Sequence, residues 1–354
     1  GAIFSPTGGT PDFNDVAYDT NVNKIVMVYT DGASTGNGRV ATATVSGTTG
    51  SFGSPTTIVS GVDVHYGTIV FDSTAKKMVI AYRVDNTQSD ALVFQAAGSE
   101  ANSANFAGIT NQAINNSASG EVVVEGGVIT NSQLLPLAYT GSLGSAAVYQ
   151  STATEYQGIT FDSSNNKIVV AYKDDSNQHG TAAVGTVSGT GITWGTPVAF
   201  KSHYTLDVCI AAGGGKVLIG YSSNSEGYYR TYVIVGTVSG TSISFGSEVV
   251  LEDNQAADGD LAYCATRDRF AYAYSKNGGR ISLRMISISG TTPSNAGGEY
   301  EPNGSQNGGT PGIGAFVSGG EDYFVMVYKN TSNNSRATYN VAQVTSGSSY
   351  TSLS

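Results

Sequence analysis

Apolar positions in residues 158–200 fall into four short runs separated by polar, glycine-containing turns. Gly158–Asp162 is the first run, and Lys167–Tyr172 is the second, which ends in a tyrosine. After a polar loop, Thr181–Ser188 and Ile192–Phe200 lie on either side of a glycine-centred turn. Short runs of β-branched and aromatic residues, bounded by Asn, Asp, Gly and Ser, are typical of strands in hairpins. No helical periodicity competes, so this stretch predicts a four-stranded antiparallel sheet.

The same pattern recurs along the chain, and the tyrosine that ends the second run gives its register. The clear cases are Tyr29, Tyr82, Tyr172, Tyr221, Tyr274 and Tyr328. The 143 residues between Tyr29 and Tyr172 fit three periods of about 48 better than two of about 71, given the roughly 50-residue spacing elsewhere. We therefore expect a degenerate unit in the gap, built around Glu121–Gly127, Leu134–Thr140 and Ala146–Gln150.

Seven units of four strands, at about 50 residues each, indicate an all-β, seven-bladed β-propeller. The predicted blades of this single domain, residues 1–354, are approximately 10–62, 63–112, 113–152, 153–202, 203–254, 255–302 and 303–354 plus 1–9. Ala2–Pro6 resembles the fourth strands Phe52–Pro55 and Trp194–Pro197, and few residues follow the third strand of the last unit. We expect the N-terminal residues to complete the last blade, which would pair the termini and leave no free sheet edge. A six-bladed ring with an insertion around residues 95–135 is the alternative.

Composition narrows the choice of partners. The net charge is −10 and the sequence pI is about 4.7, which argues against nucleic acid or an anionic membrane as the partner. No apolar run approaches the 18 or so residues of a membrane span, so we expect no membrane insertion. Cys209 and Cys264 occupy matching first-strand positions, which predicts two buried thiols instead of a disulfide.

Signatures of catalysis and metal binding are not found. The three histidines are not at metal-ligand spacing, and neither a P-loop nor a G-x-S-x-G elbow occurs. Thr190–Trp194 resembles the Asp-box turn of sialidase propellers but carries Thr where the aspartate begins that turn, so we interpret it as a structural hairpin. Asp19, Asp72 and Asp162 recur after the first strand, where we expect each carboxylate to cap its own turn instead of binding calcium. We expect no catalytic residues, metal or cofactor.

Aromatic residues recur where one unit passes to the next. Phe13, Tyr66, Tyr156 and Tyr204 each lie 16 or 17 residues before the tyrosine of their second strand. In a propeller this crossing shares a face with the loops between strands two and three, which are long and polar here. Aromatic rings beside hydrogen-bonding groups suit carbohydrate. The predicted ligand-binding residues are Tyr66, Tyr156, Tyr204, Asp85, Asp174, Asp175 and Arg230. The alternative is that these aromatic rings only pack between adjacent blades.

Two kinds of segment give the chain a family resemblance. Residues 94–128, FQAAGSEANSANFAGITNQAINNSASGEVVVEGGV, resemble a module of the tail-fibre proteins of marine and cyanobacterial phages. TVSGTSISFGS (237–247) and FDSSNNKIVVAYKD (161–174) are similar to propeller repeats of the same phage proteins and of some bacterial surface proteins.

The resemblance implies a non-enzymatic virion appendage that presents a loop face to a glycan or protein of the host surface. Its location would be the virion surface or extracellular space. Its other partners would be virion or fibre subunits, and self-association into a homo-oligomer stays open. A purely structural subunit of a fibre or extracellular filament is the second hypothesis. A glycan-cleaving enzyme is the third, and it would need two carboxyl groups about 5–10 Å apart in a deep cleft.

Overall fold

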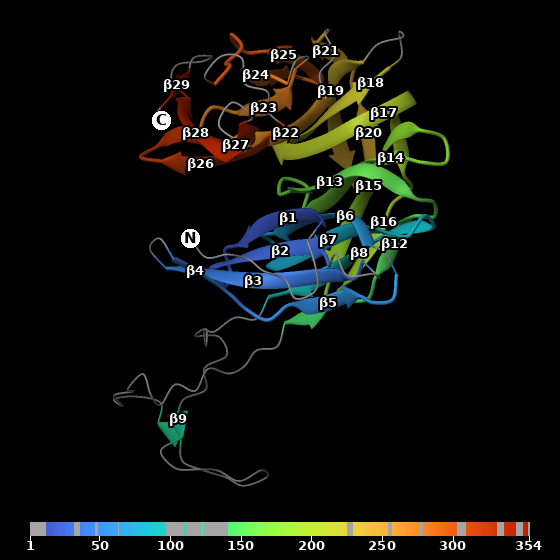
Figure 1. Ribbon diagram of the computed structural model, residues 1–354. Coiled ribbons are helices and arrows are strands. Elements are labelled where there is room, and N and C mark those ends of the chain that lie inside the picture. Colours follow the sequence, from blue (N-terminus) through green and yellow to red (C-terminus); the bar gives the residue numbers. More distant parts are fainter. Residues whose placement is uncertain are drawn as a thin grey trace.

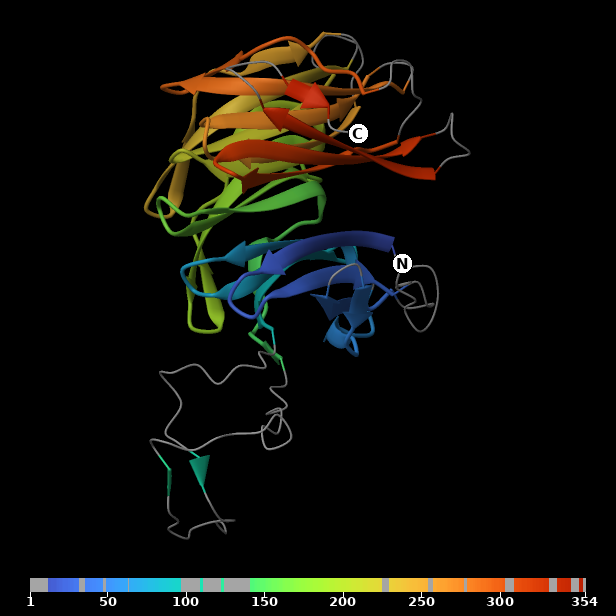
Figure 2. The same cartoon turned by 90° about the vertical axis from the view of Figure 1, so that its left-hand side faces the viewer.

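The computed structural model describes residues 12–31, 36–46, 49–62, 64–96, 109–110, 122–123, 141–224, 229–253, 257–276, 279–302, 309–330, 336–344 and 350–352. These ranges contain strands and turns and no helix. Consequently no helix that could cross a membrane occurs in them. The strands form antiparallel sheets that follow one another around a common hollow, as in a β-propeller (Figure 1, Figure 2). The all-β propeller expectation is confirmed.

The described strands form six successive units of four or five strands, which we number sheet 1 to sheet 6 in chain order. Sheet 1 contains β1 (Asp12–Asp19), β2 (Lys24–Thr30), β3 (Gly38–Ser46), β4 (Thr49–Phe52) and β5 (Thr56–Val59). Sheet 2 contains β6 (Val64–Asp72), β7 (Lys77–Val84), β8 (Gln88–Gln95), β11 (Ser142–Leu143) and β12 (Ala147–Gln150). Sheet 3 contains β13 (Thr154–Asp162), β14 (Lys167–Asp174), β15 (His179–Ser188) and β16 (Gly191–Trp194).

Sheet 4 contains β17 (Val198–Gly213), β18 (Lys216–Ser223), β19 (Arg230–Ser239), β20 (Ser242–Phe245) and β21 (Val249–Glu252). Sheet 5 contains β22 (Ala257–Cys264), β23 (Arg269–Ser275), β24 (Ile281–Ser289) and β25 (Thr292–Asn295). Sheet 6 contains β26 (Gly312–Ser318), β27 (Glu321–Asn330), β28 (Arg336–Val344) and β29 (Tyr350–Ser352). Two further short strands, β9 (Ile109–Thr110) and β10 (Val122–Val123), pair with each other.

The fourth position of most sheets is built from two segments that pair with the third strand one after the other. In sheet 1, β4 and then β5 pair with β3, and in sheet 4, β20 and then β21 pair with β19. Sheet 3 uses β16 and then the first half of β17, which continues into sheet 4 as its first strand. The β11 and β12 strands follow the same rule on β8. They therefore complete sheet 2.

This pairing bears on the number of blades. Ala146–Gln150 was expected in a separate unit over residues 113–152, but β12 belongs to sheet 2. The expected strands at Glu121–Gly127 and Leu134–Thr140 lie almost wholly outside the described residues. Seven blades are thus not confirmed, and the six described units agree with the alternative of an insertion around residues 95–135.

The last sheet has its own fourth strand. The β29 strand pairs with β28 through Ala342↔Ser352 and Val344↔Tyr350. By position, β29 corresponds to the first of the two segments that form the fourth position in sheets 1 and 4. Ala2–Pro6 lies outside the described residues, so its predicted pairing stays a prediction.

The second strands form the centre of each interface between sheets, because consecutive residues alternate between two covered faces. In β7, for example, Met78, Ile80 and Tyr82 pack toward sheet 1, whereas Val79 and Ala81 pack toward sheet 3. All five are at most 1% exposed. Cys209 and Cys264 are buried free thiols, as predicted.

The aspartates that follow the first strands cap their turns, as predicted. Asp19 accepts hydrogen bonds from the amides of residues 21 and 22 at 2.9 and 3.3 Å. Asp72 and Asp162 accept the equivalent pairs from residues two and three positions later. Their carboxylates are committed to these Asx turns.

Candidate functional site

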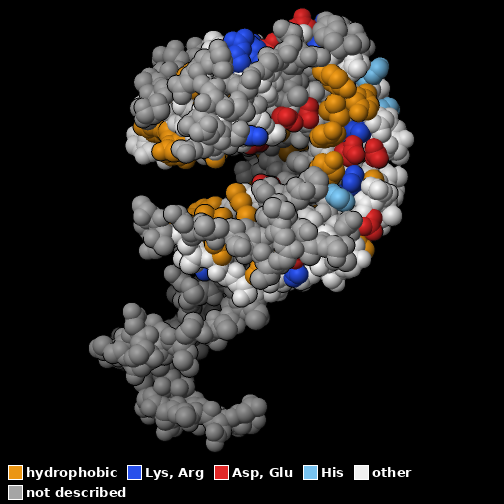
Figure 3. Space-filling model, viewed as in Figure 1, with side chains coloured by type: hydrophobic (Ala, Val, Ile, Leu, Met, Phe, Trp, Pro, Cys, Tyr) orange, Lys and Arg blue, Asp and Glu red, His pale blue; other side chains and the backbone are white. Residues whose placement is uncertain are grey.

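The first strands surround a central channel of about 860 Å³. Its wall is formed by β1, β6, β13, β17 and β22 and by residues 310–312 at the start of sheet 6. The hollow is visible in Figure 3, where the sheets curve around it. Ligand sites are concave and are often found at the mouths of barrels, so the channel is the candidate location of a site.

Two half-buried carboxylates in the channel wall connect neighbouring sheets. Asp15 of sheet 1 accepts hydrogen bonds from the Ile69 amide (2.9 Å) and the Thr68 hydroxyl (2.8 Å) of sheet 2. Asp260 of sheet 5 accepts one from the Ile313 amide of sheet 6 at 2.9 Å. Burial raises the pKa of Asp15 and raises that of Asp260 to about 6. Because backbone amides occupy these oxygens, we assign both residues to the scaffold.

At one end of the channel the first strands share a β-bulge. The pairing with the second strand shifts between His65 and Thr68, and equivalent shifts occur in β1, β13, β17 and β22. The bulged residues Tyr66, Tyr156, Asp207 and Asp258 all have φ between 47° and 52°. A bulge re-aims the side chain that it carries. All four residues line this end of the channel, which we call the mouth.

Aromatic rings and cations pack against one another at the mouth. The rings of Tyr66 and Tyr156 have centroids 6.1 Å apart and are tilted by 46°. The Arg83 guanidinium lies 5.0 Å from the centroid of Tyr66. The Lys173 ammonium lies 5.7 Å from the Tyr156 centroid and 5.1 Å from the Tyr204 centroid. The ring contact between Tyr66 and Tyr156 and the two cation–π contacts of Lys173 therefore join all three tyrosines into one surface.

Acidic side chains hold these cations in place. Glu155 lies 2.6 Å from Lys173 and 3.7 Å from Arg83, and Asp175 lies 3.6 Å from Lys173. Burial alone would lower the pKa of Lys173, but the hydrogen bond and charge of Glu155 raise it overall. Lys173 is thus a fixed positive charge at neutral pH.

A pair of carboxyl groups completes the mouth. Asp207 accepts a hydrogen bond from the Asp258 backbone amide and another from the Ser222 hydroxyl, and its carboxyl group is hydrogen-bonded to that of Asp258. Burial raises the pKa of Asp207 to about 6, and the charge of Asp258 adds to the rise. Burial followed by the charge of Asp207 raises the pKa of Tyr156 to about 12. Asp207 therefore holds its proton up to about pH 6.

Some of the predicted ligand-binding residues meet at this mouth and others do not. Tyr66, Tyr156, Tyr204 and Asp175 come together. Asp174 is buried and accepts hydrogen bonds from the Ser176 hydroxyl (2.7 Å) and amide (3.0 Å) and from the Thr152 hydroxyl (3.0 Å). Arg230 forms an ion pair with Asp253, and Asp85 sits half-buried in the β7–β8 loop with a φ of 45°.

Tyr204 reaches the mouth from a different position than the sequence predicts. The residue equivalent to Tyr66 and Tyr156 in sheet 4 is Asp207, because it follows the last regular pair before the bulge, Leu206↔Ser222. The first hairpin of sheet 4 closes as Gly213↔Lys216, two residues shorter than Asp162↔Lys167 in sheet 3. Counting back from the second-strand tyrosine therefore selects the wrong residue in sheet 4.

Apart from Asp175, the sequence reasoning missed the charged residues of the mouth. Arg83 and Lys173 both follow directly on the second-strand tyrosine, and this shared position is the signal that could have identified them. Glu155 immediately precedes Tyr156. Asp207 and Asp258 carried no signal until the bulge positions were known.

The Asp207–Asp258 pair does not have the spacing of a glycosidase's carboxyl pair. Retaining enzymes separate the two groups by about 5–5.5 Å and inverting enzymes by about 6.5–9.5 Å. Asp207 and Asp258 are instead in direct hydrogen-bond contact. Within the described ranges no three His, Cys, Asp or Glu side chains are grouped so as to hold a metal ion.

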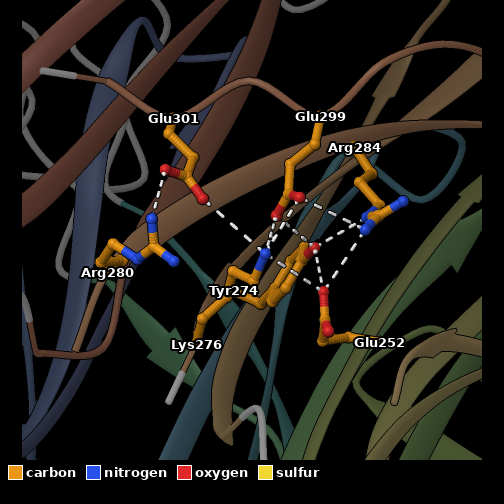
Figure 4. A network of polar contacts seen from close by, with 7 residues as sticks. All are labelled: Glu252, Tyr274, Lys276, Arg280, Arg284, Glu299 and Glu301. Atoms are coloured by element: carbon orange, nitrogen blue, oxygen red, sulfur yellow. Dashed lines mark hydrogen bonds and ion pairs between the residues drawn. The ribbon is translucent and has the colours of Figure 1, made fainter. Parts of the chain in front are cut away.

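A second polar cluster, at sheet 5, is compensated internally. Figure 4 shows its members, Glu252, Tyr274, Lys276, Arg280, Arg284, Glu299 and Glu301. Glu299 lies 2.9 Å from Lys276 and 3.3 Å from Arg284, and the hydroxyl of Tyr274 donates to it at 2.9 Å. Burial alone would raise the pKa of Glu299, but Lys276 and its other partners lower it overall. Since each charge has an opposite partner, we interpret this cluster as a connection between sheets 4 and 5.

Comparisons with known proteins give structural matches only. No protein-family model matches the chain, and no curated protein matches it. An α-L-arabinanase from Penicillium chrysogenum, complexed with arabinobiose, superposes with a TM-score of 0.53 at 12% identity, covering 94% of this chain and 93% of its own. An intramolecular trans-sialidase from Ruminococcus gnavus, complexed with oseltamivir carboxylate, gives 0.51 at 10% identity and covers 98% and 94%. A mutant of AofleA from Arthrobotrys oligospora gives 0.51 at 8% identity and covers 96% and 86%.

These similarities establish the fold and go no further, because the identities are too low to carry function. Two of the three proteins are named as enzymes, so the expectation of a non-enzymatic protein gains no support from them. By its architecture the chain is a β-propeller.

Proposed function

We propose that the mouth of the channel binds a glycan without cleaving it, and that the chain serves as a recognition module of a virion appendage. The observation that carries the binding proposal is the joined surface of Tyr66, Tyr156 and Tyr204. The resemblance of residues 94–128 and of the repeats to phage tail-fibre proteins supports the appendage. A virion-surface or extracellular location follows from the same resemblance.

The mouth has the two components that a sugar needs. Ring faces can stack on sugar C–H groups, while Glu155, Asp175 and the Asp207–Asp258 pair can accept hydrogen bonds from hydroxyl groups. Arg83 and Lys173 already have acidic partners, and carboxyl groups outnumber cations at the mouth. We therefore propose a neutral sugar as the preferred ligand.

The proposal is tested by binding measurements with single variants. Each stacked ring should contribute about 1 kcal/mol, so Tyr66→Ala, Tyr156→Ala and Tyr204→Ala should each weaken glycan binding about fivefold. Tyr156→Phe, which keeps the ring, should bind nearly as well as the wild type. Phe52→Ala is the matched control, because Phe52 lies on β4 away from the channel wall and is 40% exposed, compared with 39% for Tyr204.

The measurement is titration calorimetry with neutral oligosaccharides found by glycan-array screening. If the Tyr→Ala variants lose several kcal/mol of stability but bind glycan as well as the wild type, the rings only pack between sheets and the binding proposal is wrong. Release of new reducing ends on prolonged incubation would instead favour cleavage.

A further inference from the structure

One glutamine side chain in the wall of the channel joins the two sheets that carry Tyr66 and Tyr156. Gln157 directly follows the bulged residue Tyr156 in β13 of sheet 3 and is half-buried. Its Nε2 atom donates a hydrogen bond of 2.5 Å to the backbone carbonyl oxygen of Tyr66 in sheet 2. The two residues are 91 positions apart in the chain, so this contact forms only because sheets 2 and 3 lie side by side.

The orientation of the Gln157 amide is set by its partners. The Tyr66 carbonyl can only accept a hydrogen bond, so the nitrogen of the amide must face it. The amide oxygen accepts from the Tyr149 hydroxyl at 2.6 Å and from the Thr154 hydroxyl at 2.8 Å. The Ser89 hydroxyl lies 2.8 Å from that of Thr154 and extends the network into sheet 2. Turning the amide over would place its oxygen against the Tyr66 carbonyl oxygen, so the side chain holds one geometry.

The backbone at Tyr66 is one that needs such an anchor. Its φ of 51° lies in the left-handed region, which a residue with a side chain keeps only where other contacts hold it. The regular pairing of β6 with β7 is interrupted between His65 and Thr68. The next residue, Gly67, has no side chain to restrict the peptide that carries the anchored oxygen. The hydrogen bond from Gln157 therefore restrains the peptide group from which the Tyr66 ring is positioned.

Among sheets 2 to 5, Gln157 is the one side chain at its position that can form such a bond. The bulged residues of sheets 2, 4 and 5 are followed by Gly67, Val208 and Gly259, whose side chains carry no polar atom. Glycine or an apolar residue is therefore sufficient for the fold of a first strand here. The amide of Gln157 occurs where two tyrosine rings meet across the interface between two sheets.

We infer that Gln157 is a positioning residue of the mouth, which holds the Tyr66 ring in the place where it forms one surface with Tyr156. The two ring centroids lie 6.1 Å apart with a tilt of 46°. The Arg83 guanidinium, 5.0 Å from the Tyr66 centroid, also donates to the Thr154 carbonyl oxygen at 3.4 Å and so belongs to the same network. The consequence for glycan binding rests on the function proposed above, whereas the consequence for the Tyr66 ring does not.

The experiment compares two substitutions that remove the donor. In Gln157→Glu the carboxylate keeps the shape of the side chain and can still accept from the Tyr149 and Thr154 hydroxyls, but it cannot donate to Tyr66. Gln157→Met removes the donor without adding a charge. An effect that both variants share therefore comes from the lost donor and not from a new charge.

Gln150→Glu is the matched control. Gln150 is also half-buried, and its Nε2 atom donates to the Thr152 hydroxyl at 2.7 Å while its Oε1 atom accepts from the Tyr172 hydroxyl at 3.3 Å. It lies on β12 and does not line the channel. The control thus makes the same chemical change in a similar environment away from the mouth.

A fluorinated tyrosine incorporated at Tyr66 reports the position of the ring without any ligand. We expect its fluorine NMR resonance to shift and broaden in Gln157→Glu and in Gln157→Met, and to stay in place in Gln150→Glu. A resonance that is unchanged in both Gln157 variants would overturn the inference, whatever happens to binding.

Binding measurements then test whether Gln157 acts through Tyr66. With the neutral oligosaccharide selected on the glycan array, each Gln157 variant should lose about as much affinity as Tyr66→Ala, about fivefold. On the Tyr66→Ala background the same substitutions should have no further effect, because the ring that they position is absent. Equal losses with and without the ring would also overturn the positioning role. If the wild type binds no oligosaccharide, the proposed function is wrong, and the fluorine measurement still decides the role of Gln157.

Discussion

At the scale of single residues, Asp207 makes the stability of the protein depend on pH. Its pKa is about 6 in the folded protein, against 3.8 for an ordinary aspartate, chiefly because the carboxyl group is buried. Between these two pH values the folded protein holds a proton that the unfolded chain has released. The protonated Asp207 carboxyl group therefore contributes its full stability below about pH 3.8, and this contribution is lost as the pH rises through about 6.

Replacing Asp207 with asparagine should remove this dependence. At pH 7 to 8 the Asp207→Asn variant should be more stable than the wild type by about 1–3 kcal/mol, because one buried charge is absent. Below about pH 4 the difference should vanish. Urea unfolding between pH 4 and 8 measures it. A difference that is constant over this range would show that Asp207 is not protonated on folding.

Predictions for single residues succeeded where a side chain forms hydrogen bonds with its near neighbours in the sequence. The Asx turns of Asp19, Asp72 and Asp162 needed only local spacing. The first hairpin of sheet 4 is two residues shorter than that of sheet 3, and Tyr204 lies 17 instead of 16 residues before its second-strand tyrosine, so counting residues selected a position three residues from Asp207. Long-range contacts such as Lys173 with Tyr204 follow from neither periodicity nor composition.

At the scale of elements, a glycine after the fourth strand controls how closely successive sheets approach. A Cβ atom on Gly144, Gly195 or Gly246 would lie 1.9 to 2.2 Å from a carbonyl oxygen in the hairpin turn of the next sheet. The backbone amide of Gly195 also donates to Val184 at 2.8 Å, which fixes it in its own sheet. The Gly195 backbone therefore cannot move away from the next sheet without breaking this hydrogen bond in its own sheet.

Gly195→Ala should therefore destabilise the protein by more than about 2 kcal/mol, because the clash is with backbone and not with a flexible side chain. Gly298→Ala is the control, since no atom lies within 4 Å of its Cβ position. That change should stay within about 0.5 kcal/mol. Chemical unfolding of both variants provides the comparison. Equal stabilities would mean that the sheets can separate at no cost.

The sequence could reveal the second strands directly, but the end of sheet 2 only through a short motif that contains this glycine. The second strands were predictable because continuous apolar runs are buried on both faces. Leu143-Gly-Ser repeats the end of a fourth strand, as in Phe52-Gly-Ser and Phe245-Gly-Ser. That motif, read together with the following Ala147–Gln150, could have assigned residues 142–150 to sheet 2 instead of to a separate unit. The period alone could not, because an insertion of nearly one period looks like a missing unit.

At the scale of the whole molecule, seven blades and six blades with an insertion differ in where residues 96–141 leave sheet 2 and where the chain returns to it. The pairing Gln95↔Ser142 joins the end of β8 to the start of β11. Directly opposed antiparallel residues have Cα atoms about 5 Å apart. The 46 residues between them therefore leave and re-enter sheet 2 at one point, as the turn of any other hairpin does.

It follows that replacing residues 98–139 with a short Gly- and Asn-containing turn should leave the propeller folded, with the free energy of unfolding changed by about 1 kcal/mol or less. Extending the deletion to residue 152 is the matched control. It also removes β11 and β12, and with them Tyr149, which is 3% exposed and packs between sheets 2 and 3. Loss of that ring and of the strand pairing should cost at least about 3 kcal/mol. Circular dichroism melts and small-angle scattering distinguish the two outcomes. If the shorter deletion unfolds the protein as the longer one does, residues 98–139 form part of the ring and the seven-bladed arrangement is correct.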